Sequence, residues 1–362
     1  MADKVKICSL NCQGLGDYKK RRDVLKYLQK SNYNIVCLQD THFTKNSERQ
    51  IRNEWGFTTF FSSFNSRSRG VAIFFNNNFE FKIHNFVLDM GGNFIIIDLE
   101  MNDNRVTFVS LYGPNKDEPT FYENLKKRIN NYKNHNIIIV GDWNVLLNPE
   151  LDGHNYKHLN NPQARQQILY LISELNLYDA WREENQEERV FTWKRKIRNE
   201  ELQMGRLDYF LVSESLIHYS CNELIRPGYR TDHSIVELTL NFGKTRSKGK
   251  SFWKFNNTLL YNKDFVKEIK NSFLNTKMQY AVFPYNPLKI DEIDNEIFES
   301  VLNPQLFLEM LLLNARSISI SMSTAIRKKE TEITHSLENK IEKLELNDPI
   351  KNYDEISVLK KN

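Results

Sequence analysis

The sequence predicts an α/β fold: a four-layer sandwich in which two mostly antiparallel sheets pack face to face, with helices outside and a C-terminal helical extension. Two patterns support this prediction. Strands alternate with amphipathic helices near the start of the chain and again after residue 115, whereas residues 57–111 contain successive short strands without helices. The period-two alternation of those strands, with Asn and Gly turns between them, indicates antiparallel pairing.

Composition narrows the class of protein. The chain has 362 residues and 40% hydrophobic content, enough for a large core and an appendage. The net charge of +4 is too small to identify a nucleic-acid-binding protein, so any basic surface has to be found locally. Four cysteines without a CxxC pair favour a reducing compartment and argue against a zinc ribbon. No N-terminal signal region is present and no apolar run approaches the ~20 residues of a membrane span. We therefore expect an intracellular protein, not secreted, with no membrane partner.

The first two predicted strands each end in a polar side chain. Val5–Leu10 leads to Asn11, and Ile35–Leu38 leads to Asp40, with a predicted amphipathic helix between them over 18–29. Asn11 either makes a turn or orients another catalytic side chain. Asp40 is either an exposed loop acid or a ligand for a hard cation such as Mg²⁺, which takes one or two protein carboxylates. His42 lacks a partner at ligand spacing, which favours a polar rim residue over a zinc ligand.

The middle of the chain supplies the antiparallel run and a tyrosine at its end. The predicted strands are Thr58–Phe61, Val71–Phe75, Phe79–Phe86, Asn93–Leu99 and Val106–Leu111. Tyr112 follows the last of them, immediately before a Gly-Pro turn. The residue either aims its hydroxyl at a ligand or closes the edge of the sheet as an aromatic plug.

The stretch from 136 to 144 predicts a strand buried on both faces, because β-branched residues run without interruption up to Gly141. Helices predicted over 119–132 and 163–175 flank it. Asp142 and Asn144 follow the strand, and in extended backbone two residues apart they point the same way, as a phosphate-binding pair would. A turn in which both side chains hydrogen-bond their own backbone explains the stretch equally well.

The next predicted unit is a long hairpin with a basic tip. Its strands are Val190–Trp193 and Leu207–Val212, and between them lie the cations Lys194, Arg195, Lys196 and Arg198. Such a cluster is either part of a solvated loop or a binding surface for a polyanion. The second strand carries Asp208, and Asp232 and His233 precede a further strand over 235–240. An acid beside an imidazole can bind metal or phosphate and move a proton.

Six strand-end motifs in order carry a family resemblance. They are LNCQGL, LQDTH, LYGPN, GDWN, RLDYF and TDHS, spread across residues 10–234. Together they resemble the endonuclease/exonuclease/phosphatase superfamily, which includes abasic-site endonucleases, DNase I and several phosphatases. LQDTH, LYGPN and GDWN are most similar to the endonuclease domain at the N-terminus of LINE-type (non-LTR) retrotransposon polyproteins.

The resemblance implies roles for four residues at strand ends. Asn11 matches an orienting asparagine, and Tyr112 matches the active-site tyrosine. Asp142 matches the acid that activates water or assists the leaving group, and Asn144 matches the phosphate-binding asparagine. Which group acts as the general base stays open.

Five further positions match the family's later motifs and its metal site. Asp208 matches the acid that orients the histidine, and His233 matches the phosphate-contacting histidine. Thr192 falls at the threonine near the substrate phosphate. Asp40 matches the Mg²⁺-binding acid and Asp232 the second acid beside the metal. The family usually has Glu where this chain has Asp40, one methylene shorter, and Mg²⁺ tolerates distance errors poorly.

These roles imply a Mg²⁺-dependent endonuclease, with Mn²⁺ as the alternative ion, that nicks double-stranded DNA and in an intact element primes target-site reverse transcription. Element RNA and a reverse transcriptase domain are the further partners implied. Synthesis in the cytoplasm and action in the nucleus follow from that function. An abasic-site repair endonuclease, a phosphatase of the same fold and an inactive DNA-binding remnant are the alternatives; Asp40 is the main reason for the last.

Domain organisation changes after residue 242. We predict one domain over 1–242 and a basic linker with a helical extension over 243–362. The sequence GKTRSKGK at 243–250 is small, polar and basic, as linkers are. Residues 251–260 resemble the segment that follows the endonuclease in many LINE-type polyproteins. Residues 306–346 have long helical periodicity with mixed charges, typical of an exposed or pairing helix.

Overall fold

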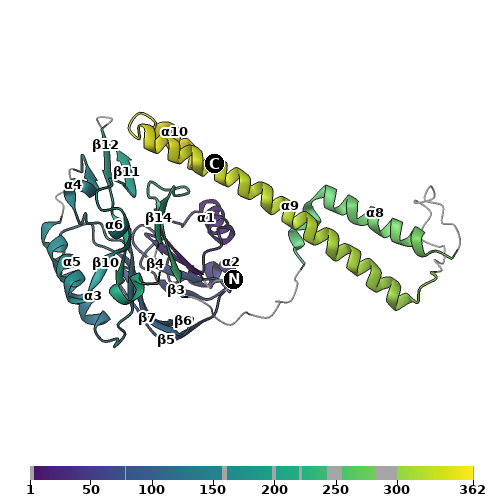
Figure 1. The fold of residues 1–362 in the computed structure, drawn as a ribbon, viewed down its shortest axis with the longest axis horizontal. Helices are drawn as coiled ribbons and strands as arrows, with labels where there is room; N and C mark the ends of the chain where they lie inside the picture. The colour runs from purple at the N-terminus through teal and green to yellow at the C-terminus, as the bar shows by residue number, and fades with distance from the viewer. Residues whose placement is uncertain are drawn as a thin grey trace. The chain divides into compact units, whose positions relative to one another are not determined.

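The computed structural model of the chain describes residues 4–77, 79–156, 161–197, 201–219, 222–242, 255–282 and 300–361 (Figure 1). The chain divides into two compact units. One contains residues 1–247 together with 340–362, and the other contains residues 248–339. The predicted linker at 243–250 and residues 251–254 lie outside the described residues, so the boundary at 242 stays a prediction.

The first unit contains a mixed six-stranded sheet built around the N-terminal strand. Its order is β14 (Asn222–Arg226), β15 (Ile235–Asn241), β1 (Lys4–Asn11), β2 (Ile35–Gln39), β4 (Val71–Phe75) and β3 (Thr59–Ser62). β1 and β2 run parallel, and the other described neighbours run antiparallel.

The second six-stranded sheet repeats this arrangement around the central buried strand. Its order is β10 (Leu177–Asp179), β13 (Asp208–Ser213), β8 (Ile137–Asp142), β7 (Asn104–Tyr112), β6 (Phe94–Met101) and β5 (Phe81–Leu88). β7 and β8 are parallel, and the remaining described pairs are antiparallel. The prediction of two mostly antiparallel sheets is confirmed.

Helices cover the outer face of each sheet and make four layers. α1 (Tyr18–Lys30) and α2 (Glu48–Trp55) bury apolar residues in one outer core with the first sheet, and α3 (Pro119–Ile129) and α5 (Pro162–Glu174) do so with the second. α2 is too short to show a helical period and was missing from the prediction. The shorter helices of this unit are α4 (Pro149–Asp152), α6 (Ala180–Glu184) and α7 (Glu214–Ile217).

Strand β8 is buried on both faces, because it lies between two of these layers. Ile138 and Val140 belong to the core between the two sheets, whereas Ile137 and Ile139 belong to the core under α3 and α5. All are buried, as the run of β-branched residues predicted. Gly141 has φ +151°, and a Cβ there would overlap the Leu111 carbonyl oxygen.

The predicted long hairpin is wrong in its pairing. β11 (Trp193–Lys196) pairs with β12 (Leu202–Gly205), which also pairs with β9 (Gly153–His154), while β13 belongs to the second sheet. The predicted cations Lys194, Arg195 and Lys196 therefore lie within strand β11 rather than at a tip.

Arg206 explains this break between β12 and β13. Its buried guanidinium bonds the carboxylates of Asp152 and Asp179, at 2.8 Å and 2.6 Å for the shortest contact to each. A buried cation needs such partners. Because Arg206 bonds both carboxylates, the chain leaves the three-stranded sheet after β12 and enters the second six-stranded sheet at β13.

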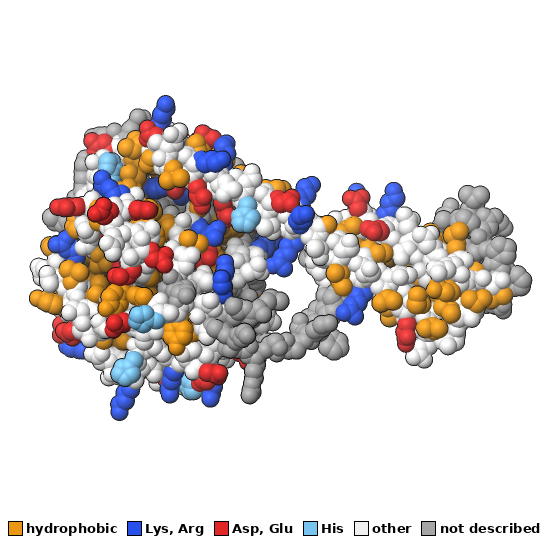
Figure 2. All heavy atoms as spheres, in the orientation of Figure 1, with side chains coloured by type: hydrophobic (Ala, Val, Ile, Leu, Met, Phe, Trp, Pro, Cys, Tyr) orange, Lys and Arg blue, Asp and Glu red, His pale blue; other side chains and the backbone are white. Residues whose placement is uncertain are grey.

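The described residues of the second unit are mostly helical. η1 (Asn257–Tyr261), α8 (Lys263–Tyr280) and most of α9 (Pro304–Asn347) belong to it, and the end of α9 with α10 (Tyr353–Leu359) belongs to the first unit. The predicted helical extension is confirmed. Hydrophobic side chains gather over the N-terminal part of α9 in Figure 2, where Leu308, Leu312 and Leu313 are more than half exposed.

One helix among the described residues differs from the expectation of no membrane-length segment. α9 is long and apolar enough, by length and composition, to cross a membrane. It carries Glu309 and Arg316 in its apolar first half, and an ionised side chain at the centre of a bilayer is costly. A single helix of this kind is weak evidence for a membrane span.

Candidate active site

The ends of five strands bring the candidate residues to one edge of the two sheets. In the second sheet, Tyr112 is in register with Asp142, and Asp142 is in register with Asp208. In the first sheet, Asn11 is in register with Gln39, so Asp40 emerges beside it. Parallel pairing of β1 with β2 and of β7 with β8 places these strand ends at the same edge.

Asp142 connects the two sheets. Asn11 Nδ2 donates a 2.8 Å hydrogen bond to Asp142 Oδ2, and the backbone N–H of Asn144 donates a 2.9 Å hydrogen bond to Asp142 Oδ1. The residue is 1% exposed. Each of the carboxylate oxygens thus has a fixed donor, which holds the side chain in one orientation.

The predicted extended geometry of Asp142 and Asn144 is wrong. Asn144 has φ +54°, a left-handed conformation that Asn tolerates, and its side chain donates to the Gly113 carbonyl at 2.8 Å. The backbone hydrogen bond from Asn144 to Asp142 is the turn chemistry that the sequence left open. Asn144 lies beside the Asp142 carboxylate, but its side-chain amide already donates a hydrogen bond to the Gly113 carbonyl.

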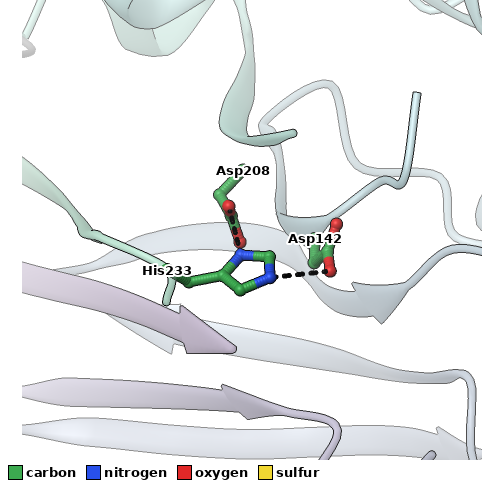
Figure 3. A group of neighbouring side chains, drawn as sticks. All are labelled: Asp142, Asp208 and His233. Carbon is green, nitrogen blue, oxygen red and sulfur yellow. Dashed lines mark hydrogen bonds and ion pairs between the residues drawn. The ribbon is translucent and has the colours of Figure 1, made fainter. Parts of the chain in front are cut away.

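His233 lies between two carboxylates (Figure 3). Its Nδ1 is 2.8 Å from Asp208 Oδ2, which accepts a hydrogen bond from Nδ1–H. Nε2 faces Asp142 Oδ2 at 4.0 Å and Asp232 Oδ1 at 3.9 Å. These separations exceed hydrogen-bond length. Nε2 is therefore the ring atom placed to meet a group that enters between Asp142 and Asp232.

Thr192 positions Asp208. Its hydroxyl donates to Asp208 Oδ2 at 2.7 Å and accepts the amide hydrogen bonds of Leu207 and Asp208 at 2.9 Å and 3.0 Å. The residue is fully buried. These contacts are those of a residue that orients the acid behind the histidine; direct contact with a substrate phosphate stays a prediction.

A short backbone pairing fixes the loop that carries Asp232 and His233. Ser234 N donates to Thr192 O at 2.6 Å, and Lys194 N donates to Asp232 O at 3.2 Å. Trp193 and His233 form the bridge between them. The start of β11 therefore holds the loop of Asp232 and His233 in place.

The two predicted metal ligands differ in how their oxygens are engaged. Asp40 has φ +50°, and its Oδ1 accepts the Arg69 amide at 2.9 Å and lies 3.1 Å from His42 Nε2. Asp232 Oδ2 accepts from the Trp193 indole at 3.2 Å. Asp232 Oδ1 is buried without a hydrogen-bond partner among the described residues, which fits an oxygen that ligates a cation.

A second set of metal-capable side chains overlaps the site. One potential ligand atom from each of Asp142, Asp208 and His233 lies within 4.8 Å of the others, and all three residues are buried. Nδ1 of the imidazole is already bonded to Asp208 Oδ2, which leaves Nε2, Asp142 and Asp208 Oδ1 for an ion. A hard cation such as Mg²⁺ prefers oxygen ligands, and both Asp208 and Asp232 offer a buried oxygen without a hydrogen-bond partner among the described residues.

Burial and neighbouring charges shift the titration of the central pair. Burial, reinforced by the negative charge of Asp208, raises the pKa of Asp142 to about 7, although His233 and Asn11 act against it. Burial alone would lower the pKa of His233, but Asp208, with Asp142 and Asp232, outweighs it and raises that pKa to about 9. At neutral pH the imidazole is therefore a cation beside a partly protonated acid.

Tyr112 closes the edge of the sheet with its ring, whereas contact of its hydroxyl with a ligand stays a prediction. Its ring belongs to the core between the sheets, and 8% of the residue is exposed. Burial first, then the charges of Asp142 and Asp40, hold the pKa of its hydroxyl well above the usual value. The phenol therefore stays protonated and can donate a hydrogen bond.

Lys20 was missed by the sequence reasoning. Its Nζ donates to the carbonyls of Cys12 and Gln13 at 2.7 Å and 2.9 Å. Burial lowers the pKa of Lys20, and the nearby carboxylates of Asp232 and Asp40 offset only part of that shift. Residues 19–22 at the start of α1 are all cations, an unfavourable charge at a helix N-terminus, and this was the available sequence signal.

The predicted substrate-binding cations differ in their surroundings. Arg195 is exposed on β11, whereas Lys194 and Lys196 form ion pairs with Glu345 and Asp354. Arg198 lies outside the described residues.

Comparison with solved structures shows the fold. An AP endonuclease from Archaeoglobus fulgidus is 18% identical with a TM-score of 0.53, covering 66% of this chain and 99% of that one. AP endonuclease LMAP from Leishmania major is 17% identical with a TM-score of 0.55, covering 66% and 88%. The 3′ phosphatase NExo from Neisseria, bound to product DNA hairpin, is 19% identical with a TM-score of 0.52, covering 66% and 100%.

Comparison of sequences identifies the family. The chain is 25% identical over 274 residues to the Transposon TX1 uncharacterized 149 kDa protein of Xenopus laevis. That match covers 74% of this chain and 20% of the Xenopus protein. The model of the Endonuclease/Exonuclease/phosphatase family matches residues 8–233, which include all six strand-end motifs except the last residue of TDHS. The chain belongs to the Endonuclease/Exonuclease/phosphatase family, as those motifs predicted.

Proposed function

We propose that this chain is a Mg²⁺-dependent endonuclease that nicks double-stranded DNA by hydrolysing one phosphodiester bond. One observation carries the proposal: a buried imidazole, oriented by Asp208, faces the carboxylates of Asp142 and Asp232 at the common edge of two sheets. The abasic-site endonucleases and the DNA-bound phosphatase with the same fold support a DNA substrate.

His233 binds and neutralises the scissile phosphate. A phosphodiester is an anion, and attack by water requires that its charge be stabilised as the negative charge grows. The hydrogen bond from Nδ1 to Asp208 leaves Nε2–H directed at the incoming phosphate oxygen. Thr192 holds Asp208 in the position that this orientation needs.

Asp142 handles the proton of the attacking water. With a pKa of about 7, it is near the value at which a general acid or base works best at neutral pH. In this assignment, water forms the new P–O bond, its proton passes to Asp142, and the P–O bond to the departing 3′-oxygen breaks. Asn11 fixes the carboxylate oxygen that lies toward His233.

Asp40 and Asp232 are the residues that would hold Mg²⁺, or Mn²⁺, with water completing the ligand set. When bound, the ion would neutralise charge on the phosphate and on the departing oxygen. The buried, unpartnered Oδ1 of Asp232 supports this assignment. Asp40, where the family usually has Glu, uses one oxygen to hold the Arg69 amide and His42.

The similarity to a transposon protein supports a role in transposition. The chain spans a fifth of that relative's length. We propose that in an intact LINE-type element the nick primes reverse transcription at the target site, with element RNA and a reverse transcriptase domain as partners. The site of action would then be nuclear.

An abasic-site repair endonuclease is the second candidate, favoured by the fold shared with two AP endonucleases. Supercoiled plasmid and two matched duplexes, one intact and one with a single abasic site, separate the two functions. We expect Mg²⁺-dependent nicking of the plasmid and of the intact duplex, and sequencing of the nicks gives the preference. Cleavage confined to the abasic duplex would select repair, and release of inorganic phosphate alone would select a phosphatase.

A further inference from the structure

The end of the chain lies against the basic strand β11. Residues 340–361, called the C-terminal segment below, belong to the same compact unit as the two sheets. Glu345 Oε1 lies 2.8 Å from Lys194 Nζ and 3.4 Å from Lys360 Nζ. The Asp354 carboxylate bonds Lys196 Nζ at 2.7 Å and 2.8 Å. Two cations predicted to bind substrate are therefore held by carboxylates of this segment.

Apolar and backbone contacts hold the segment as well. Ile341 and Ile356 are each 4% exposed. Arg230 N donates to Lys360 O at 3.0 Å, and the Tyr353 ring lies 5.2 Å from Lys196 Nζ. Contacts of this kind define a docked segment rather than a tail that meets the surface by charge alone.

The segment also walls a cavity beside the candidate active site. The cavity has a volume of about 490 Å³. Lys20, Arg230 and Asp232 line it from the side of the two sheets, and Tyr353, Ser357 and Lys360 line it from the C-terminal segment. Asp232 is the acid adjacent to His233, so the cavity that the segment walls reaches the candidate active site.

The two lysines have the geometry of a backbone-binding pair. Lys194 and Lys196 are two residues apart on one strand, so they lie on the same face, with Cα atoms about 7 Å apart. Carboxylate and phosphate oxygens are equivalent partners for an ammonium group. Arg195, between them, faces the other way and is exposed. Lys194 and Lys196 thus hold the carboxylates of Glu345 and Asp354 at two neighbouring positions beside the candidate active site. These positions suit successive phosphate groups of one nucleic-acid strand.

We propose that Lys194 and Lys196 are two phosphate-binding subsites for the DNA backbone flanking the scissile bond, and that Glu345 and Asp354 occupy them in the DNA-free chain. This inference rests on the proposed function. DNA binding then exchanges two internal carboxylates for two phosphates, and the C-terminal segment leaves β11. The free chain is therefore partly masked against DNA.

The test measures DNA binding by the full chain. Glu345→Gln with Asp354→Asn is compared with the wild type by fluorescence anisotropy on a labelled duplex of about 30 base pairs, with EDTA present to prevent cleavage. We expect about tenfold tighter binding, equivalent to about 1.4 kcal/mol, because DNA no longer has to displace two internal carboxylates from the lysines. Hydrogen exchange in α10 should also speed up when duplex is added to the wild type.

A matched control for the Asp354→Asn change is Glu355→Gln, which also removes one negative charge from α10. Glu355 pairs with Lys340 at 2.9 Å instead of with β11, so the variant's affinity for DNA should change little. Asp354→Asn alone is a second test, because the Asp354 side chain is 80% exposed and its loss does not threaten folding. Lys196→Ala should cost more affinity in the Asp354→Asn background than in the wild type.

Unchanged or weaker binding by both acid variants would overturn the inference, and weaker binding would place the C-terminal segment within the DNA-binding surface. A gain equal to that of Glu355→Gln would reduce the effect to net charge and also overturn it. Plasmid nicking by the wild type tests the proposed function separately. Tighter DNA binding by the variants without any nicking would keep this inference and reject the catalytic proposal.

Discussion

The catalytic pocket and the basic strand β11 are neighbours, yet they are held together in different ways. Buried hydrogen bonds fix the pocket, and its residues come from strand ends whose register is set by the sheets. Ion pairs hold two cationic side chains of β11, and their carboxylates come from the far end of the chain. A pocket of the first kind is preorganised for chemistry, whereas a surface of the second kind can exchange its partners.

The largest expected effect is a loss of nicking activity when a pocket residue is replaced. His233→Ala or Asp142→Ala should reduce Mg²⁺-dependent nicking of supercoiled plasmid by at least about 100-fold, because each removes a charge or proton carrier from the reacting groups. Circular dichroism checks that the fold is kept. His84→Ala is the matched control, since His84 lies on the edge strand β5 beside Glu100. Undiminished nicking by both pocket variants would defeat the assignment.

Removing a metal ligand comes next. Asp232→Asn keeps the size of the side chain and its acceptor for the Trp193 indole, but it removes the charge that would bind a divalent ion. We expect half-maximal nicking to require at least about tenfold more Mg²⁺, with Asp40→Asn giving the same direction. Calorimetric titration of Mg²⁺ into the DNA-free variants gives a readout apart from activity. Equal Mg²⁺ affinity in wild type and both variants would place the ion elsewhere.

The pH profile tests the charges of the same pocket. Asp142 must be ionised to accept a proton, so kcat/KM should rise with pH through the pKa of about 7. His233 must be protonated to bind phosphate, so kcat/KM should fall as pH rises through the pKa of about 9. A bell-shaped curve with a maximum near about pH 8 is expected, and a bound cation would move both limbs to lower pH. Activity that decreases as pH rises toward the pKa of Asp142 would contradict these roles.

Thr192 should show a smaller, indirect effect. Thr192→Val leaves Asp208 without one hydrogen bond and leaves two buried backbone amides without an acceptor. We expect kcat to fall by about tenfold, the upper limb of the pH profile to move, and stability to fall by roughly 1–3 kcal/mol. Thr192→Ser keeps the hydroxyl and should restore the pH profile. A rise in KM alone, with the profile unmoved, would instead indicate direct substrate contact.

The sequence predicted the pocket much better than the surface next to it. Strand ends are local features, so the acid after a buried strand could be placed at Asp142 without knowing the fold, and β pairing then brought Tyr112 and Asp208 beside it. The left-handed turn at Asn144 escaped prediction because it depends on one dihedral angle, which Asn allows but does not require.

Prediction failed where partners are distant in sequence or where one buried cation redirects the chain. The partner of Lys196 is 158 residues away, and no local pattern indicates such a pair. The hairpin was mispaired because no local pattern indicates that Arg206, between the two predicted strands, is buried and bonds Asp152 and Asp179. Charge runs therefore predicted that β11 is basic but not which of its cations are masked.

The smallest expected effect separates the exposed and the masked cations of β11. Arg195→Ala should reduce the slope of log affinity against log salt by about 0.9, the value for one phosphate contact to B-DNA. Lys196→Ala should change that slope less, because in the free chain Asp354 already neutralises this ammonium and its release offsets part of the gain. Anisotropy titrations between about 50 and 200 mM salt measure both slopes. Equal reductions would mean that the ion pair with Asp354 imposes no cost on binding, and no change in either variant would remove β11 from the DNA interface.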